Sequence, residues 1–208
     1  MTDREQILAS LHQHQRAVTH PPAWETRRRF DDLAERFTAS LTAGAGEVHR
    51  AVNLAEALDI LGQVLVELPA RMVAVNAEPP LDGIDLAARW PDVEWLVAGP
   101  SGTDLRAFCA AADVGITGVD AALAETGTIV VSSGPGKSRL VSLLPPVHIA
   151  LVPTSSLTVD LFTWTAARGG AMPASVTLIS GPSKTADIEQ VMAIGVHGPK
   201  RLIVILYD

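Results

Sequence analysis

A glutamate lies in a short polar turn near the middle of this sequence. Glu125 is followed by Thr126 and Gly127, and a β-branched run begins at Thr128. A carboxylate at such a turn can attack an electrophile, act as a general base, or accept hydrogen bonds from backbone N–H groups. The residues leave these three roles open, and we take Glu125 as the candidate catalytic residue.

A basic loop follows the same β-branched run. Lys137 and Arg139 lie in or directly after the Gly-Pro-Gly-Lys-Ser segment, residues 134–138. Two cations and free loop amides can hold a carboxylate or a phosphate, although the same residues also suit a solvated loop. The Gly-Lys-Ser ending resembles a P-loop, but the earlier glycine of that motif falls on Val131, inside the apolar run. A P-loop for ATP is therefore not expected.

Two further loop residues join the candidate site. Gly118 follows an apolar run, and His197 precedes the last apolar run of the chain. Ligands in open α/β sheets bind beyond the carboxyl ends of strands, where glycine lets a ligand approach the backbone. The candidate ligand-binding residues are therefore Gly118, Thr126, Gly127, Thr128, Lys137, Arg139 and His197. His148, inside an apolar run, is expected to be a hydrogen-bonded structural residue.

Short apolar runs predict the strands that position these residues. The runs are residues 72–75, 93–97, 114–117, 128–131, 147–152, 176–179 and 202–206. Helical patterns at 103–112 and 155–167 lie between some of them, and Ser183 or Thr185 would cap a further helix. This is the βαβ order of an α/β fold, an open and mostly parallel sheet with helices on both faces.

The chain divides into an arm and a domain on this interpretation. Residues 1–45 have polar helical patterns with narrow apolar stripes, and we expect a helical N-terminal arm outside the core. At Asn53 and Glu56 a capping-box-like pattern begins a helix whose leucines recur at helical spacing. Residues 46–208 are predicted to form the α/β domain.

Composition restricts the classes of function. The formal net charge of −7 opposes the phosphate backbone of nucleic acids, so no nucleic-acid partner is expected. The single cysteine, Cys109, allows neither an internal disulfide nor a cysteine-held cluster, and it shares an apolar helical stripe that indicates a buried packing residue. His12 and His14 do not face each other on a helix, so no metal site is expected. No signal peptide and no membrane-spanning run are visible, which favours a cytoplasmic protein.

Three segments together resemble the LUD-domain family, and within it the lactate utilization proteins of type C. They are GITGVDAALAETGTIVVSS (residues 115–133), SRLVSLLPPVHIALVP (138–153) and SGPSKTADIEQVMAIGVHGPKRL (180–202). The resemblance covers about residues 45 to 208. It implies a fold similar to the ribose-phosphate isomerase and coenzyme A transferase superfamily. It also implies a part in the oxidation of L-lactate to pyruvate, beside iron–sulfur partner proteins that carry the clusters.

The resemblance leaves more than one role open. In the first, the chain is a non-redox subunit or accessory protein that binds a small carboxylate or its iron–sulfur partners, with no cofactor of its own. In the second, it is an acyl-transfer or sugar-phosphate isomerase-like enzyme, because Glu125-Thr126-Gly127 is similar to the attacking glutamate motif of coenzyme A transferases. In the third, it is a carboxylate-sensing regulatory module. The proposed site requires Glu125 to meet Lys137 and Arg139 in one hollow at the rim of the sheet.

Overall fold

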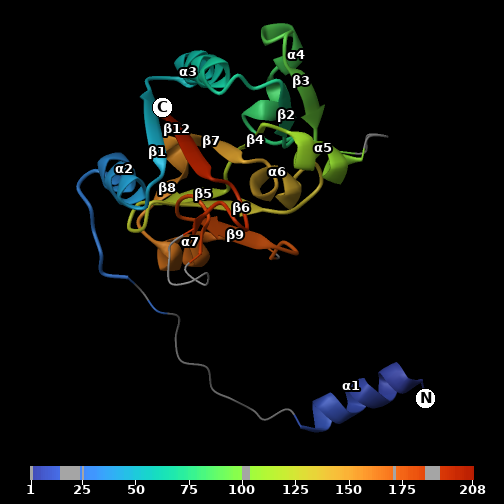
Figure 1. Ribbon diagram of the computed structural model, residues 1–208. Helices are drawn as coiled ribbons and strands as arrows, with labels where there is room; N and C mark the ends of the chain where they lie inside the picture. The colour runs from blue at the N-terminus through green and yellow to red at the C-terminus, as the bar shows by residue number, and fades with distance from the viewer. Residues whose placement is uncertain (1, 15–23, 25, 100–103, 171, 186–192) are drawn as a thin grey trace.

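A parallel sheet of six strands forms the centre of the molecule (Figure 1). The computed structural model describes residues 2–14, 24, 26–99, 104–170, 172–185 and 193–208. In spatial order the strands are β1 (Glu47–Ala51), β12 (Arg201–Tyr207), β7 (Val147–Pro153), β4 (Val114–Thr117), β2 (Met72–Val75) and β3 (Glu94–Val97). Every neighbouring pair is parallel, which confirms the predicted α/β fold with a mostly parallel sheet.

The structure also contains a second, smaller sheet, whereas the sequence predicted a single sheet. Its order is β8 (Leu157–Thr158), β5 (Ala121–Leu123), β6 (Thr128–Ser132) and β9 (Val176–Ile179). Two of the predicted strands belong here, and β6 is antiparallel to both β5 and β9. The reason is local: only residues 124–127 join β5 to β6, and a link this short can connect antiparallel strands but not parallel ones.

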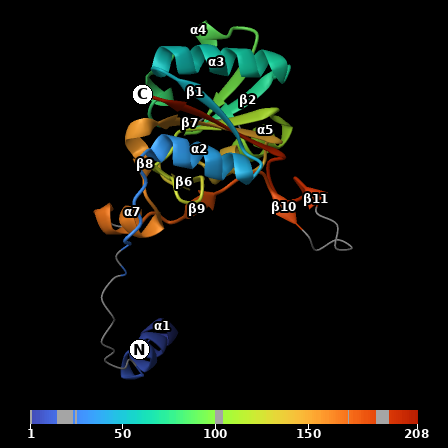
Figure 2. The ribbon, with the colours of Figure 1, turned by 90° about the vertical axis from the view of Figure 1, so that its left-hand side faces the viewer.

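Helices cover both faces of the main sheet. Figure 2 shows α3 (Leu54–Glu67) on one side and α2 (Leu33–Ala43) on the other. The start of α3 agrees with its sequence pattern, because the Asn53 side chain accepts a hydrogen bond from the Glu56 N–H at 2.9 Å. The other helices are α1 (Asp3–Gln13), α4 (Leu86–Arg89), α5 (Leu105–Ala111), α6 (Arg139–Leu143) and α7 (Leu161–Ala167), with 3-10 turns η1 (Leu81–Gly83) and η2 (Thr154–Ser156). None of the described helices is both long and apolar enough to cross a membrane.

Two apolar layers hold these elements together. Leu61 and Leu65 of α3 pack on the outer face of the main sheet. Phe37 and Leu41 of α2 pack on the inner face, together with Ile129 of β6. Each fully buried side chain of this size contributes roughly 1.5–3 kcal/mol to the free energy of unfolding.

The N-terminal 45 residues behave in two ways. The described side chains of α1 are all exposed, as expected for a polar arm. In α2, by contrast, Phe37 and Leu41 are fully buried in the domain, although the sequence led us to expect an arm outside the core. The apolar stripe that predicted this helix is its packing face.

Two expected helices differ from the structure. The expected helix 155–167 is shorter in the structure. Residues 155 and 156 lie in the 3-10 turn η2, and Leu157 and Thr158 pair with β5. The α-helix α7 begins only after Asp160, whose side chain accepts from the Thr163 N–H at 2.8 Å. Lys184 and Thr185 form a strand, β10, that pairs with β11 (Ala193–Ile194), so no helix begins directly after Ser183. A helix capped by Thr185 would fall on residues 186–192, which lie outside the described part of the chain.

Candidate functional site

A buried glutamate follows strand β2 and meets the end of strand β4. The Gly118 N–H donates to Glu78 Oε1 at 3.1 Å, and Asn76 Nδ2 donates to the same oxygen at 3.2 Å. Both Asn76 and Glu78 are buried. They can meet Gly118 because β2 and β4 are parallel, with Val75 opposite Ile116, so both strands end at the same edge. This is the edge where open α/β sheets bind ligands.

Lys137 completes this group from the loop after β6. Its Nζ donates to Glu78 Oε2 and to Asp120 Oδ1, each at 3.0 Å. Partial burial acts to lower the pKa of Lys137, but the hydrogen bonds to Asp120 and Glu78 outweigh it and raise that pKa above its ordinary value. The lysine is therefore charged, between two carboxylates. We call Asn76, Glu78, Gly118, Asp120 and Lys137 the carboxyl-edge cluster.

Backbone contacts fix the loop that carries Lys137. Asn76 Oδ1 accepts from the Ser138 N–H at 2.9 Å, and the Gly136 carbonyl accepts from the Ala77 N–H at 2.9 Å. Gly136 has a φ of +71°, which glycine adopts at no steric cost. At Gly118 a Cβ would lie 2.3 Å from the Pro79 carbonyl oxygen, so a larger residue cannot fit without moving the segment that holds Glu78.

A buried histidine contacts the residue that precedes Gly118 of the cluster. His148 Nε2 and Thr117 Oγ1 lie 2.9 Å apart, directly before Gly118 along β4. His148 is 1% exposed, and burial lowers its pKa to about 4. The imidazole is therefore neutral at pH 7, and its hydrogen bond agrees with the structural role expected from the sequence.

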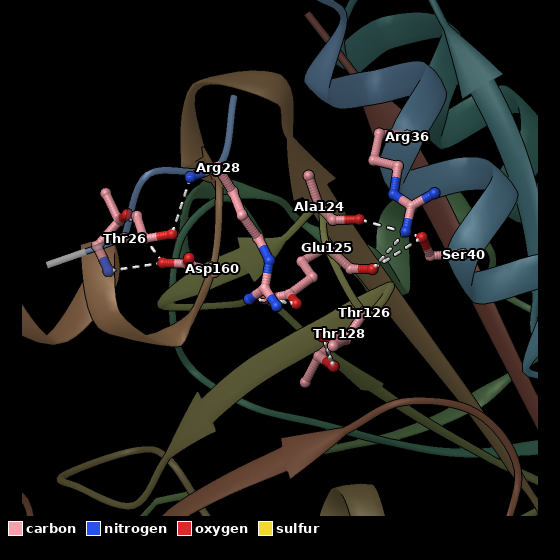
Figure 3. A network of polar contacts seen from close by, with 10 residues as sticks. Thr26, Arg28, Arg36, Ser40, Ala124, Glu125, Thr126, Thr128 and Asp160 are labelled. Atoms are coloured by element: carbon pink, nitrogen blue, oxygen red, sulfur yellow. Dashed lines mark hydrogen bonds and ion pairs between the residues drawn. The ribbon is translucent and has the colours of Figure 1, made fainter. Parts of the chain in front are cut away.

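Glu125 has a different set of partners, shown in Figure 3. Its carboxylate Oε1 accepts from Arg28 Nη1 at 2.5 Å. Its backbone carbonyl accepts from Ser40 Oγ at 3.1 Å and from Arg36 Nη2 at 3.2 Å, while its N–H donates to the Val159 carbonyl at 2.9 Å. These contacts join the turn to α2 and to the segment that precedes α2.

The threonines beside Glu125 bond to one another and to the second sheet. Thr126 Oγ1 and Thr128 Oγ1 lie 2.6 Å apart, and Thr128 Oγ1 lies 2.7 Å from Ser180 Oγ. Gly127 has a φ of +62°, and a Cβ there would lie 2.2 Å from the backbone nitrogen of Leu41. Each of these residues therefore has a structural reason for its identity.

Arg28 lies between two acids. It pairs with Glu125, and its charge also acts on Asp160. Burial acts to raise the pKa of Asp160, but hydrogen bonds from Thr26 and Thr163, together with Arg28, outweigh it and lower that pKa below its ordinary value. The carboxyl groups of Glu125 and Asp160 thus hold the Thr26–Arg28 segment on the domain.

The structure does not bring all the sequence-predicted residues into one hollow. Glu125 precedes β6 and Lys137 follows it, so the length of this strand, about 15 Å at roughly 3.3 Å per residue, separates the two turns. Arg139 is exposed at the start of α6. His197 is exposed and precedes the amino end of β12, whereas the carboxyl-edge cluster lies at the opposite edge.

Two distinct groups result. Gly118 and Lys137 belong to the carboxyl-edge cluster, and Thr126, Gly127 and Thr128 belong to the Glu125 turn. Sequence reasoning did not select Asn76 or Glu78. The signal that could have found them is their position directly after the apolar run 72–75, at the predicted end of a strand.

Comparisons with known proteins agree on one family. A family model described as LUD domain matches residues 34–207. The chain is 31% identical over 204 residues to lactate utilization protein C of Geobacillus sp. (strain WCH70), covering 88% of this chain and 81% of that protein. It is 47% identical over 103 residues to lactate utilization protein C of Halalkalibacterium halodurans. That second match spans 47% of this chain and 45% of the relative, so the chain spans less than half the length of this relative.

A solved structure shows the same fold. The crystal structure of a DUF162 family protein from Deinococcus radiodurans superposes with a TM-score of 0.60 and 23% sequence identity. The superposition covers 85% of this chain and 96% of that one. The α/β architecture described above is therefore one that an experimentally determined protein also adopts.

Proposed function

Since this chain belongs to the LUD domain family, we propose that it serves in lactate utilization as a non-redox protein, and that the carboxyl-edge cluster binds a small hydroxy carboxylate. The observation that carries the proposal is the position of Lys137 between Glu78 and Asp120 at the carboxyl ends of β2 and β4. The names of the relatives support a role in lactate utilization, and the geometry of the cluster supports a hydroxy carboxylate as the class of ligand.

The cluster offers both kinds of hydrogen-bonding group that a 2-hydroxy acid needs. An ammonium has three N–H donors, of which two are directed to Glu78 and Asp120 in the described contacts, and the third can serve a ligand carboxylate. The carboxylates of the cluster can accept from a ligand hydroxyl. An anion without a hydroxyl group suits the cluster less well, because it has no O–H to donate to the carboxylates of Glu78 and Asp120. Side chains of Asp120 and Lys137 are 25% and 26% exposed, so solvent reaches them.

In this proposal, other proteins carry out the electron transfer of lactate oxidation. The sequence contains one cysteine, and Cys109 is buried, with its pKa raised to about 11 by burial. A protonated, buried thiol cannot supply the set of thiolates that holds an iron–sulfur cluster. We therefore propose iron–sulfur proteins of lactate utilization as partners of this chain.

Glu125 has a structural role in this proposal. An attacking carboxylate or a general base must reach the substrate, whereas the Glu125 carboxylate is paired with Arg28 and its turn is bonded to α2. The acyl-transfer alternative depends on this one residue. The contacts of Glu125 thus favour the non-redox binding protein over that enzyme.

Deletion of the gene, followed by growth on L-lactate and gentle affinity purification, tests the proposal. We expect slow growth on L-lactate alone, rescue by the wild-type chain, and recovery of an iron–sulfur protein with it. Lys137→Met should fail to rescue, whereas Lys200→Met, which removes an exposed lysine at the other edge of the sheet, should rescue. Normal growth of the deletion strain on L-lactate would refute the proposal.

A further inference from the structure

Helix α1 has an apolar stripe that the described part of the chain leaves uncovered. Ile7, Leu8 and Leu11 are 61%, 40% and 60% exposed. The helix itself is well defined at its start, where Thr2 and Glu5 form a complete capping box. A helix of 11 residues is marginal in water without a packing partner. A surface that accepts this stripe would therefore stabilise α1.

An apolar hollow of about 420 Å³ lies on the α3 side of the domain. Its walls come from the end of α3 and from the connection between α4 and β3, and they include Leu65, Val66, Trp90 and Val93. Val66 is 80% exposed. Gly62 shapes the wall, because a Cβ there would lie 2.8 Å from Trp90 Nε1, so glycine allows the indole to approach the helix.

The stripe and the hollow match in chemistry. Amphipathic helices bind apolar grooves through residues three or four positions apart, as Leu8 and Leu11 or Ile7 and Leu11 are. The charged residues at the start of α1, Asp3 and Arg4, lie one turn before this stripe. The hollow carries Arg71, Arg89 and Asp92 beside its apolar walls. Arg89 is paired with Asp59, and Arg71 and Asp92 are opposite in sign to Asp3 and Arg4.

The chain connection favours the hollow of another molecule. Arg28 is paired with Glu125, whose turn is bonded to α2 at the inner face of the main sheet, whereas α3 covers the outer face. From Gln13 to Arg28 the chain can span at most about 54 Å. A path around a domain of this size, with a radius of about 20 Å, is roughly 60 Å long.

We infer that α1 of one molecule inserts its Ile7, Leu8 and Leu11 stripe into the hollow beside α3 of a second copy. The exchange is reciprocal, so the same contact forms twice around a two-fold axis. The product is a homodimer in which both stripes and both hollows are covered.

Sedimentation of the full-length chain over a range of concentrations tests the dimer. Leu11→Asp on the helix and Val66→Asp at the hollow should each raise the dimer dissociation constant at least tenfold. The matched controls are Ala9→Asp, on the opposite side of α1, and Val52→Asp, an exposed apolar residue away from the hollow. Both controls should leave the constant within about twofold. A monomeric wild-type chain at 100-fold the concentration of purification would overturn the inference, as would equal effects of the control and test variants.

Cysteine pairing distinguishes the second copy from the same chain. A mixture of the Leu11→Cys chain and the Val66→Cys chain should form a disulfide-linked dimer under mild oxidation, because Cys109 is buried and does not compete. A double variant that closes only within one monomer would show that α1 binds its own domain. That result would overturn the dimer.

Discussion

The ammonium of Lys137 lies 3.0 Å from a carboxylate oxygen of Glu78. The two residues come from different parts of the chain, one from the loop after β6 and the other from the end of β2. Glu78 is 5% exposed, and the Gly118 N–H and Asn76 also bond to it. Burying a carboxylate is costly unless it is paired and hydrogen-bonded, and Glu78 has both kinds of partner at the edge where α/β sheets bind ligands.

Glu125→Gln separates the structural role of this residue from a catalytic one. Glutamine keeps the shape of the side chain but removes the ion pair with Arg28. Because the two side chains are 24% and 55% exposed, we expect a loss of less than about 1 kcal/mol in the free energy of unfolding. Growth on L-lactate should be unchanged, and limited proteolysis near residues 24–31 should become faster. Loss of lactate growth in a folded Glu125→Gln protein would support the acyl-transfer alternative.

The buried His148 predicts a specific pH dependence of stability. Its folded pKa of about 4 lies below the value of about 6.5 in an unfolded chain, so the unfolded state binds the proton first. Stability therefore falls as the pH drops below about 6.5, and this contribution stops falling near pH 4. Between pH 7.5 and 5 the loss should be about 2 kcal/mol.

Urea unfolding at the two pH values measures this effect. In His148→Gln the difference between pH 7.5 and pH 5 should shrink by about 2 kcal/mol. His12→Gln, which removes an exposed histidine of α1, should leave the difference unchanged. An equal pH dependence in the wild type and in His148→Gln would show that His148 is not held neutral.

Gly127→Ala should destabilise the chain strongly. Its φ of +62° disfavours a side chain, and the new methyl group would lie 2.2 Å from the Leu41 backbone nitrogen. We expect a loss of about 3 kcal/mol from the combined strain and displacement of α2. Gly134→Ala is the control, because a Cβ at that position meets nothing within 4 Å. Equal thermal midpoints for the two variants would contradict the packing of this turn on α2.

The sequence predicted the strands of the main sheet well because their pattern is local. Runs such as 72–75 and 114–117 are continuous apolar segments, as strands buried on both faces must be. The strand β1 was missed, since its residues Glu47, His49 and Arg50 give it no apolar run. It becomes a strand through its five-residue pairing with β12, which no local pattern encodes.

The candidate site was only partly predictable for a similar reason. Gly118 and Lys137 could be selected from local sequence alone, because the glycine follows an apolar run and the lysine lies in the Gly-Pro-Gly-Lys-Ser loop. Glu78 contacts Gly118 only because β2 and β4 are neighbours in the sheet. The order of the strands in the sheet cannot be read from a local sequence pattern. The catalytic role of Glu125 stays a prediction, and the contacts of its turn with α2 give its Gly- and Thr-rich surroundings a structural reason.

Growth on L-lactate of a deletion strain that carries Glu78→Gln tests the central claim most directly. This change keeps the size of the side chain and removes one of the two charges that hold Lys137. Its matched control is Glu94→Gln, an exposed glutamate at the amino end of β3. Circular dichroism should first show that both variants are folded. We predict that growth fails with Glu78→Gln and is normal with Glu94→Gln, whereas normal growth with both would contradict a role for the carboxyl-edge cluster in lactate utilization.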